Sequence, residues 1–224
     1  MHVCLFDIDG TLIASGGAGK AALEASLAEE FGIPEITAKL ELSWRTDRAI
    51  CRDLFRYHVL EDTPENWRRL IDGYLRHLPV CLKHRGGRIL PGVGELLERL
   101  SAHDEVRVGL LTGNTRAGAK AKLGHFGLYD HFSFGGFGDD HFDRDDVARE
   151  ALQAVHAFCN GSASLERIWV IGDTPLDIRC ARAIGARAVA VATGWHPVEE
   201  LAACKPDLLF DDLSDATPLL DRLN

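Results

Sequence analysis

Strand-length runs of apolar residues recur along this chain, and helix-like segments lie between the later ones. The runs contain almost no polar residues, which is typical of strands that are covered on both faces in a parallel sheet. They lie at residues 3–6, 106–111, 168–171, 188–192 and 208–210. Together these features predict an α/β fold, with a doubly wound, Rossmann-like parallel sheet and helices on both of its faces.

The interval between the first two runs has a different pattern. From about residue 14 to 90, the apolar residues follow helical spacing only. Glycine-rich stretches border this interval, at residues 16–19 and 86–87, as a pair of hinge strands would require. We therefore expect a small, movable helical cap over residues 14–90, inserted into a catalytic core made of residues 1–13 and 91–224.

Composition narrows the class of function. The chain has 224 residues, of which 46% are hydrophobic, enough for a substantial core, and its net charge of -9 comes without the clustered Lys and Arg of a nucleic-acid surface. The six cysteines form no C-x-x-C pair, so we interpret them as reduced thiols of a cytoplasmic protein. No apolar stretch resembles a signal region or a transmembrane helix. We expect no nucleic-acid or membrane partner.

Aspartates follow two of the predicted strands at the point where each strand ends. Asp7 and Asp9 come directly after the first run, and Asp173 and Asp177 follow the third. Because the carboxyl ends of parallel strands meet at one edge of a sheet, all four carboxylates could share one pocket. Each like-charge pair near 4 Å costs on the order of 4 kcal/mol at an effective dielectric of 20, so the arrangement needs a cation. Oxygen ligands of this kind favour Mg²⁺.

Two further segments could bind an anion at the same edge. Thr112, Gly113 and Asn114 close the second strand before a predicted helix, and they offer a hydroxyl and free backbone N–H groups. The same residues could simply be a helix N-cap. Arg144 lies in an acidic loop before another helix and could supply a fixed positive charge. A surface salt bridge within that loop is an equally compatible interpretation.

Four motifs in order resemble those of the haloacid dehalogenase superfamily of phosphohydrolases, in the branch with a helical cap inserted after the first strand. Asp7-x-Asp9-Gly10-Thr11 is similar to the first motif, Thr112-Gly113-Asn114 to the second, Arg144 to the third, and Gly172-Asp173-Thr174-x-x-Asp177 to the fourth. The third motif departs from the family pattern, because most members have Lys there. The nearest lysines, Lys120 and Lys122, come too early in the chain to replace it.

The resemblance implies a Mg²⁺-dependent phosphatase that acts on a small phosphorylated metabolite. By this resemblance, Asp7 attacks phosphorus and forms an aspartyl-phosphate. Asp9 protonates the leaving group and then deprotonates the attacking water, and we expect a neighbouring carboxylate to favour its protonated form. Mg²⁺ is held by Asp7, the backbone carbonyl of Asp9 and Asp173, with Asp177 supporting through water. Attack on phosphorus fits Asp9, because the dehalogenases of the superfamily have no acid at that position.

The resemblance also assigns the substrate contacts. Thr112, the Gly113 amide and Arg144 hold the phosphoryl oxygens, and Asn114 is a further substrate-binding candidate. The segment from Ser43 to Arg48 resembles a polar cap loop that family members turn toward the active site, and it offers Arg45 to an anionic leaving group. A helix start with Thr46 or Ser43 as N-cap is at least as compatible.

Two other functions stay open at this point. A phosphomutase of the same superfamily, similar to β-phosphoglucomutase, uses the same aspartates but returns the phosphoryl group to another hydroxyl of a sugar phosphate. A receiver-type regulatory domain stores an aspartyl-phosphate without catalysis, but the inserted helical module and Asp9 argue against it. Phosphoglycolate, sugar phosphates, nucleotides and pyrophosphate are the candidate substrates.

Overall fold

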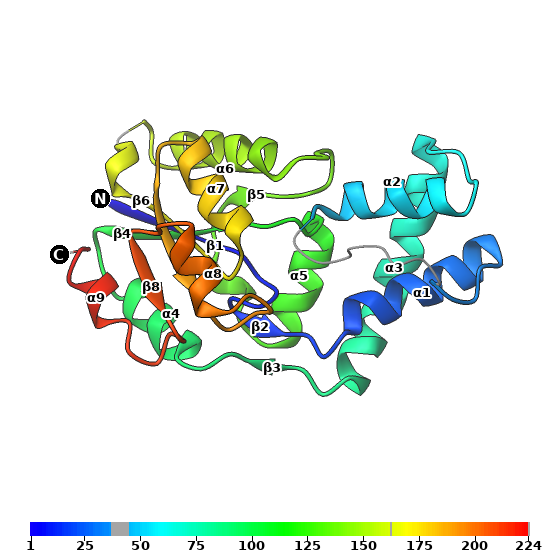
Figure 1. Ribbon diagram of the computed structural model, residues 1–224, viewed down its shortest axis with the longest axis horizontal. Helices are drawn as coiled ribbons and strands as arrows, with labels where there is room; N and C mark the ends of the chain where they lie inside the picture. Colours follow the sequence, from blue (N-terminus) through cyan, green and yellow to red (C-terminus); the bar gives the residue numbers. More distant parts are fainter. Residues whose placement is uncertain (37–44, 162, 224) are drawn as a thin grey trace.

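A sheet-and-helix part and a smaller helical part make up the protein in the computed structural model, which describes residues 1–36, 45–161 and 163–223 (Figure 1). The first part contains both ends of the described chain. The second part extends from one end of the sheet, and its regular elements within the described residues are helices. Ser43 and Trp44 of the predicted cap loop lie outside the described residues.

Six parallel strands form the main sheet in the order β5-β4-β1-β6-β7-β8, which confirms the predicted doubly wound α/β fold. The strands are β1 (His2–Phe6), β4 (Val106–Leu111), β5 (Gly135–Gly136), β6 (Ile168–Gly172), β7 (Arg187–Val191) and β8 (Leu208–Phe210). The apolar runs predicted all of them except β5. That edge strand consists of two glycines, so it has no apolar run to reveal it.

Alternate side chains of the strands pack into two hydrophobic layers, one on each face of the sheet. Cys4 and Phe6 of β1 belong to the first layer, and Val3 and Leu5 to the second. The first layer is covered by α4 (Val93–Ser101), α5 (Arg116–His125) and α9 (Thr217–Leu220). The second is covered by α6 (Arg144–Phe158), α7 (Pro175–Ala183) and α8 (Val198–Ala203). Short 3₁₀ helices, η1 (Tyr129–His131) and η2 (Leu165–Arg167), complete the core.

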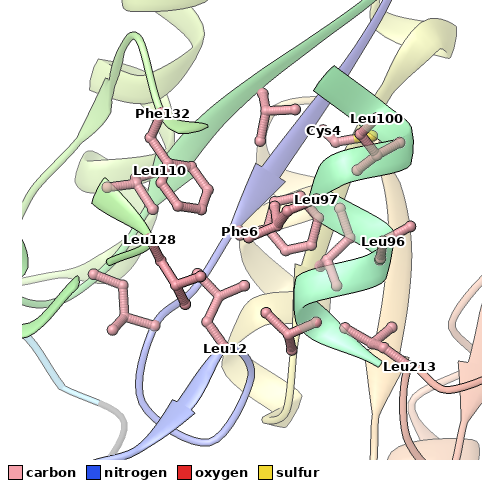
Figure 2. Close-up of a cluster of buried hydrophobic side chains, with 14 of the residues drawn as sticks. Cys4, Phe6, Leu12, Leu96, Leu97, Leu100, Leu110, Leu128, Phe132 and Leu213 are labelled. Atoms are coloured by element: carbon pink, nitrogen blue, oxygen red, sulfur yellow. The ribbon is translucent and has the colours of Figure 1, made fainter. Parts of the chain in front are cut away.

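Helix α4 anchors the first layer, where Leu97 and Leu100 point toward Phe6 and Cys4 of β1 (Figure 2). Leu97 is fully buried. We expect Leu97→Ala to lower the free energy of unfolding by about 3 kcal/mol, because it removes buried methyl groups and leaves a cavity that close-packed neighbours fill only in part. Urea denaturation measures this loss.

A matched control is Leu165→Ala, since Leu165 of η2 is 41% exposed. Its loss of stability should stay below about 1 kcal/mol. Equal losses for the two variants would contradict the assignment of Leu97 to the centre of this layer.

Three helices occupy the interval in which the helical cap was expected. They are α1 (Ala18–Phe31), α2 (Asp47–Tyr57) and α3 (Pro64–His84), and they share a hydrophobic cluster of their own. Two short antiparallel strands, β2 (Ile13–Ala14) and β3 (Arg88–Ile89), join this unit to the core (Figure 1). Within the described ranges, no helix combines the length and the hydrophobicity that a membrane span requires.

The start of α2 rests on the core at a second place, away from β2 and β3. The Asp47 amide donates to the Gly113 carbonyl at 2.7 Å, and the Arg48 amide donates to the Gly138 carbonyl at 3.4 Å. The Asp47 carboxylate accepts from the Thr115 amide at 2.7 Å. These contacts hold α2 above the loops that follow β4 and β5, at the carboxyl ends of the strands.

Candidate active site

The carboxyl ends of β1, β4 and β6 meet at one edge of the sheet. Asp7 follows β1, and its amide donates to the Ile171 carbonyl of β6 at 2.9 Å. Asn114 comes from the loop after β4, and Asp173 follows β6. The side chains of Asp7, Asn114 and Asp173 all line one pocket of about 800 Å³, which core and cap residues enclose together. The geometry therefore places the predicted motifs in one cavity.

Asp7, Asp173 and Asp177 form a buried acidic cluster, in which one carboxylate oxygen from each lies within 4.8 Å of the others. Burial, with a smaller contribution from the Asp177 carboxylate, raises the pKa of Asp7 to about 6, although Arg144 and the Thr112 hydroxyl act in the opposite direction. Burial and the two neighbouring carboxylates hold the pKa of Asp173 well above its usual range. Three close oxygen donors that repel one another fit a hard divalent cation. The cluster could therefore bind a metal ion.

The turn after β1 shapes the space around Asp173. The Thr11 hydroxyl donates to Asp173 Oδ1 at 2.9 Å. Gly10 has a φ of 89°, and a Cβ atom built on Gly10 or on Gly194 would overlap the Asp173 carboxylate. Glycine is therefore required at residue 10 both by its backbone conformation and by the close approach of this carboxylate.

Asp177 combines a place in the cluster with a structural role. It forms a capping box with Thr174 at the start of α7: Asp177 Oδ2 accepts from the Thr174 amide at 3.0 Å and from the Thr174 hydroxyl at 2.7 Å. Its other oxygen accepts from Arg144. Both oxygens of this carboxylate thus have protein partners.

Arg144 is the first residue of α6, and its side chain is 4% exposed. It donates to Asp177 and lies 3.5 Å from Asp7 Oδ2. The alternative interpretation of Arg144 as a surface salt bridge is wrong, because the guanidinium is buried against the acidic cluster. It supplies the fixed positive charge that the sequence suggested for this pocket.

The Asp9 carboxylate has a different environment from the acidic cluster. It accepts from Asn114 Nδ2 at 3.0 Å and pairs with Lys122 Nζ at 2.5 Å. Burial alone would raise the pKa of Asp9, but the Lys122 ammonium and the hydrogen bonds from Lys122 and Asn114 outweigh it and leave that pKa below its usual value. The expectation that a neighbouring carboxylate favours the protonated form is therefore wrong for this structure, because the nearest charge is an ammonium.

The segment from Thr112 to Asn114 lies between these two environments. Thr112 is fully buried; its hydroxyl bonds to Asp7 and its Oγ1 accepts from Asn114 Nδ2 at 2.9 Å. Gly113 and Asn114 line the pocket. The alternative N-cap interpretation applies instead to Thr115, whose side chain accepts from the Gly118 amide at the start of α5.

Lys122 belongs to the site, although it comes too early in the chain to match the third motif. It lies on α5, is 6% exposed, and contacts both Asp9 and Asn114. Its signal was present in the sequence, because Ala119 and Leu123 place Lys122 on the inward face of α5 by helical spacing. Lysine is almost never fully buried unless it is paired, so a lysine on such a face indicates a buried partner.

Arg45 lines the pocket, but its guanidinium already has a partner. Arg45 Nη1 lies 2.6 Å from Asp53 Oδ2. Thr46 is the N-cap of α2 and accepts from the Ala49 amide at 3.1 Å, as the alternative interpretation of this segment expected. A contact between Arg45 and substrate stays a prediction.

The chain is similar in sequence and in fold to known proteins. The model of the haloacid dehalogenase-like hydrolase family matches residues 4–182. The chain is similar to a phosphoglycolate phosphatase from Synechococcus elongatus, with 29% identity over 230 residues that cover 100% of this chain and 99% of the relative. A hydrolase from Pseudomonas syringae has the same fold, with a TM-score of 0.73 and 24% identity over 99% of both chains. CbbY from Rhodobacter sphaeroides, solved in complex with phosphate, has a TM-score of 0.76 and 17% identity over 96% of both chains. This chain belongs to the haloacid dehalogenase-like hydrolase family.

Proposed function

We propose that this protein is a Mg²⁺-dependent phosphatase that hydrolyses a small phosphorylated metabolite through an aspartyl-phosphate on Asp7. The buried cluster of Asp7, Asp173 and Asp177, with Asp9 beside it in the same pocket, is the observation that carries the proposal. Family membership and the phosphoglycolate phosphatase relative support hydrolysis of a phosphoric monoester. The match is to a hydrolase family, which favours turnover over the storage of phosphate by a receiver domain.

The donor set of the cluster fits Mg²⁺, which prefers oxygen ligands and is usually bound by one or two carboxylates with substrate phosphate. Asp7, Asp173 and the backbone carbonyl of Asp9 would hold the ion, with Asp177 supporting it through water. When bound, the ion neutralises charge on the transferring phosphoryl group. Arg144, buried beside Asp7, adds a second positive charge on the same side.

The chemistry assigns separate steps to Asp7 and Asp9. The Asp7 carboxylate attacks phosphorus, the bond from phosphorus to the leaving oxygen breaks, and that oxygen takes a proton from Asp9. Asp9 then deprotonates a water molecule, which attacks the aspartyl-phosphate and releases inorganic phosphate and free Asp7. Lys122 favours the ionised Asp9 that activates water, whereas a phosphate dianion bound beside Asp9 favours the protonated form that the first step requires. Thr112 and the Gly113 amide would hold phosphoryl oxygens.

Substrate choice is assigned to the cap of residues 14–90. Phosphoglycolate leads the candidates because the relative from Synechococcus elongatus carries that name. Arg45 lies at the pocket and would contact an anionic leaving group after giving up part of its pairing with Asp53. The six free thiols support a reducing compartment such as the cytoplasm.

Phosphate release from a panel of phosphorylated compounds, three esters and one anhydride, tests the proposal. The panel contains phosphoglycolate, a hexose 1-phosphate, a nucleoside monophosphate and pyrophosphate, each with Mg²⁺ and with EDTA. We expect release from at least one ester with Mg²⁺ and none with EDTA. Isomerised hexose phosphate without free phosphate would instead establish a phosphomutase. No reaction with any ester would contradict the proposal.

Asp9→Asn is expected to lower kcat by about 10²- to 10⁴-fold, the usual contribution of a positioned acid/base group. The amide oxygen of Asn can still accept from Lys122, so the local structure should persist. Steady-state phosphate release measures the loss. Asp72→Asn is the control, because Asp72 is exposed on α3, and it should behave like the wild type. Unchanged turnover in Asp9→Asn would exclude the acid/base role.

A further inference from the structure

We propose that Lys122 is the positioning residue for Asp9: its ammonium, together with Asn114, holds the Asp9 carboxyl group on the leaving-group side of the site. The inference rests on the proposed function, because it assigns Lys122 to the acid/base steps of phosphoester hydrolysis. It starts from a ring of contacts on the core side of the pocket.

Lys122, Asp9 and Asn114 contact one another in this ring. Lys122 Nζ lies 2.5 Å from Asp9 Oδ2 and 2.6 Å from Asn114 Oδ1. Asn114 Nδ2 donates to Asp9 Oδ2 at 3.0 Å and to Thr112 Oγ1 at 2.9 Å. The amide oxygen therefore faces the ammonium while the amide nitrogen faces the carboxylate, and each group fixes the orientation of the other two. The Ser15 hydroxyl adds a further hydrogen bond to Asp9.

The ammonium is enclosed as well as paired. Only 7% of the Lys122 side chain is exposed. A Cβ atom built on Gly19, at the start of α1, would lie 3.6 Å from Lys122 Nζ and 3.9 Å from the Tyr74 hydroxyl of α3. A lysine on the surface has a flexible side chain, so its ammonium cannot hold a partner in one position. Here α5, α1 and α3 surround the ammonium, so its position is set by the packing of cap against core.

Asp9 gains from such support because part of its side chain is exposed to the pocket. Its side chain is 37% exposed and faces the pocket, and Gly10 follows it in a left-handed turn. Proton transfer requires hydrogen-bond distance to the leaving oxygen, and a misplacement of about 1 Å can lower a rate about 100-fold. A carboxyl group on an open turn needs partners that hold it in place.

The two buried cations of the site have separate places. Arg144 lies against Asp7 and Asp177, on the side where phosphorus is attacked. Lys122 contacts Asp9 and Asn114, and neither is a member of the acidic cluster. This division assigns Arg144 to the phosphoryl group and Lys122 to the acid/base group.

Two substrates with different leaving groups test the assignment. Lys122→Met keeps the apolar stem and removes the ammonium. We expect kcat/KM for phosphoglycolate, whose alkoxide needs a proton to leave, to fall about 10- to 100-fold. For 4-nitrophenyl phosphate, whose phenolate leaves without a proton, the change should be less than about 3-fold, since the loss acts through Asp9. The control is Lys120→Met, because Lys120 is exposed on the same helix.

Equal losses on both substrates would overturn the inference, because they would place Lys122 at the phosphoryl group or in a purely structural role. The proposed function itself is wrong if the wild type hydrolyses neither 4-nitrophenyl phosphate nor any ester of the panel above. If the wild type hydrolyses both esters and Lys122→Met lowers kcat/KM equally for the two, only the role of Lys122 is wrong.

A double variant measures whether Lys122 acts through Asp9. Adding Lys122→Met to Asp9→Asn should change kcat/KM for phosphoglycolate by less than about 3-fold, because the group that Lys122 positions is already lost. The double variant also contains no unpaired Asp9 carboxylate, so it stays informative even if the single Lys122 variant is unstable. Fully additive losses would show that Lys122 acts independently of Asp9.

Discussion

Asp7→Asn is expected to lower kcat at least about 10⁴-fold, because the variant has no carboxylate that can attack phosphorus. Asn has nearly the shape of Asp, and Arg144 keeps its contact with Asp177. The activity should therefore disappear from a folded protein. Phosphate release measures the loss of kcat. In acid-quenched reactions with radiolabelled substrate, the wild-type protein should carry the labelled phosphoryl group and the variant should not.

The same substitution is expected to leave the metal-free protein at least as stable as the wild type. Because folding raises the pKa of Asp7 to about 6, from an ordinary value of 3.8, the folded state binds this proton more tightly than the unfolded state does. The stability that this group contributes is present at low pH and falls as the pH rises from about 4 to about 6, by on the order of 2 to 3 kcal/mol. Asn does not titrate, so the variant does not lose this stability as the pH rises.

Urea denaturation in EDTA at several pH values checks the sign. The variant should gain most over the wild type at pH 7, and the difference should shrink as the pH is lowered to 4. The exposed Asp72→Asn variant should follow the wild type in both activity and stability. Substantial activity in Asp7→Asn would exclude Asp7 as nucleophile, and a large loss of stability would make Asp7 a structural residue.

Magnesium is expected to stabilise the folded protein through the acidic cluster, and Asp173→Asn should abolish that effect. At a Mg²⁺ concentration 100 times its Kd, binding to the folded state adds about 2.7 kcal/mol. For a chain of this length the gain corresponds to a rise in Tm of about 5 to 10 °C. Thermal unfolding with Mg²⁺ and with EDTA measures it.

Asp173→Asn keeps an oxygen that can accept from Thr11 while it removes one ligand charge. It should melt at the same temperature with Mg²⁺ and with EDTA, and it should lose phosphatase activity. Asp72→Asn should show the full wild-type shift. A Mg²⁺-induced shift that persists in Asp173→Asn would place the cation elsewhere.

Much of the core could be predicted from sequence because its signals are local. A strand buried on both faces must be apolar along its length, so β1, β4, β6, β7 and β8 each have a run that marks them. Strand β5 consists of two glycines, and its place beside β4 depends on the fold around it. No local pattern could reveal such a strand.

The candidate site also contains residues that a local sequence pattern reveals and residues that only the fold brings together. Asp7 and Asp173 stand at the ends of recognisable strands, and parallel strands bring such ends together at one edge of a sheet. Lys122 has no motif around it, and its contact with Asp9 joins residues 113 positions apart in the chain. The sequence therefore located the acidic residues but not the cation that faces Asp9.

By itself, the sequence determined the α/β core and the edge of the sheet at which the acidic residues gather, because strand burial and strand-end residues are local properties. The bounds of the cap, residues 14–90, stay a prediction. Only the tertiary structure decided the charge environment of each carboxylate. It set Arg144 against Asp7 and Asp177, and Lys122 against Asp9. The physical reason is that a pKa and an ion pair depend on distances of a few ångströms between groups far apart in the chain, and packing alone fixes those distances.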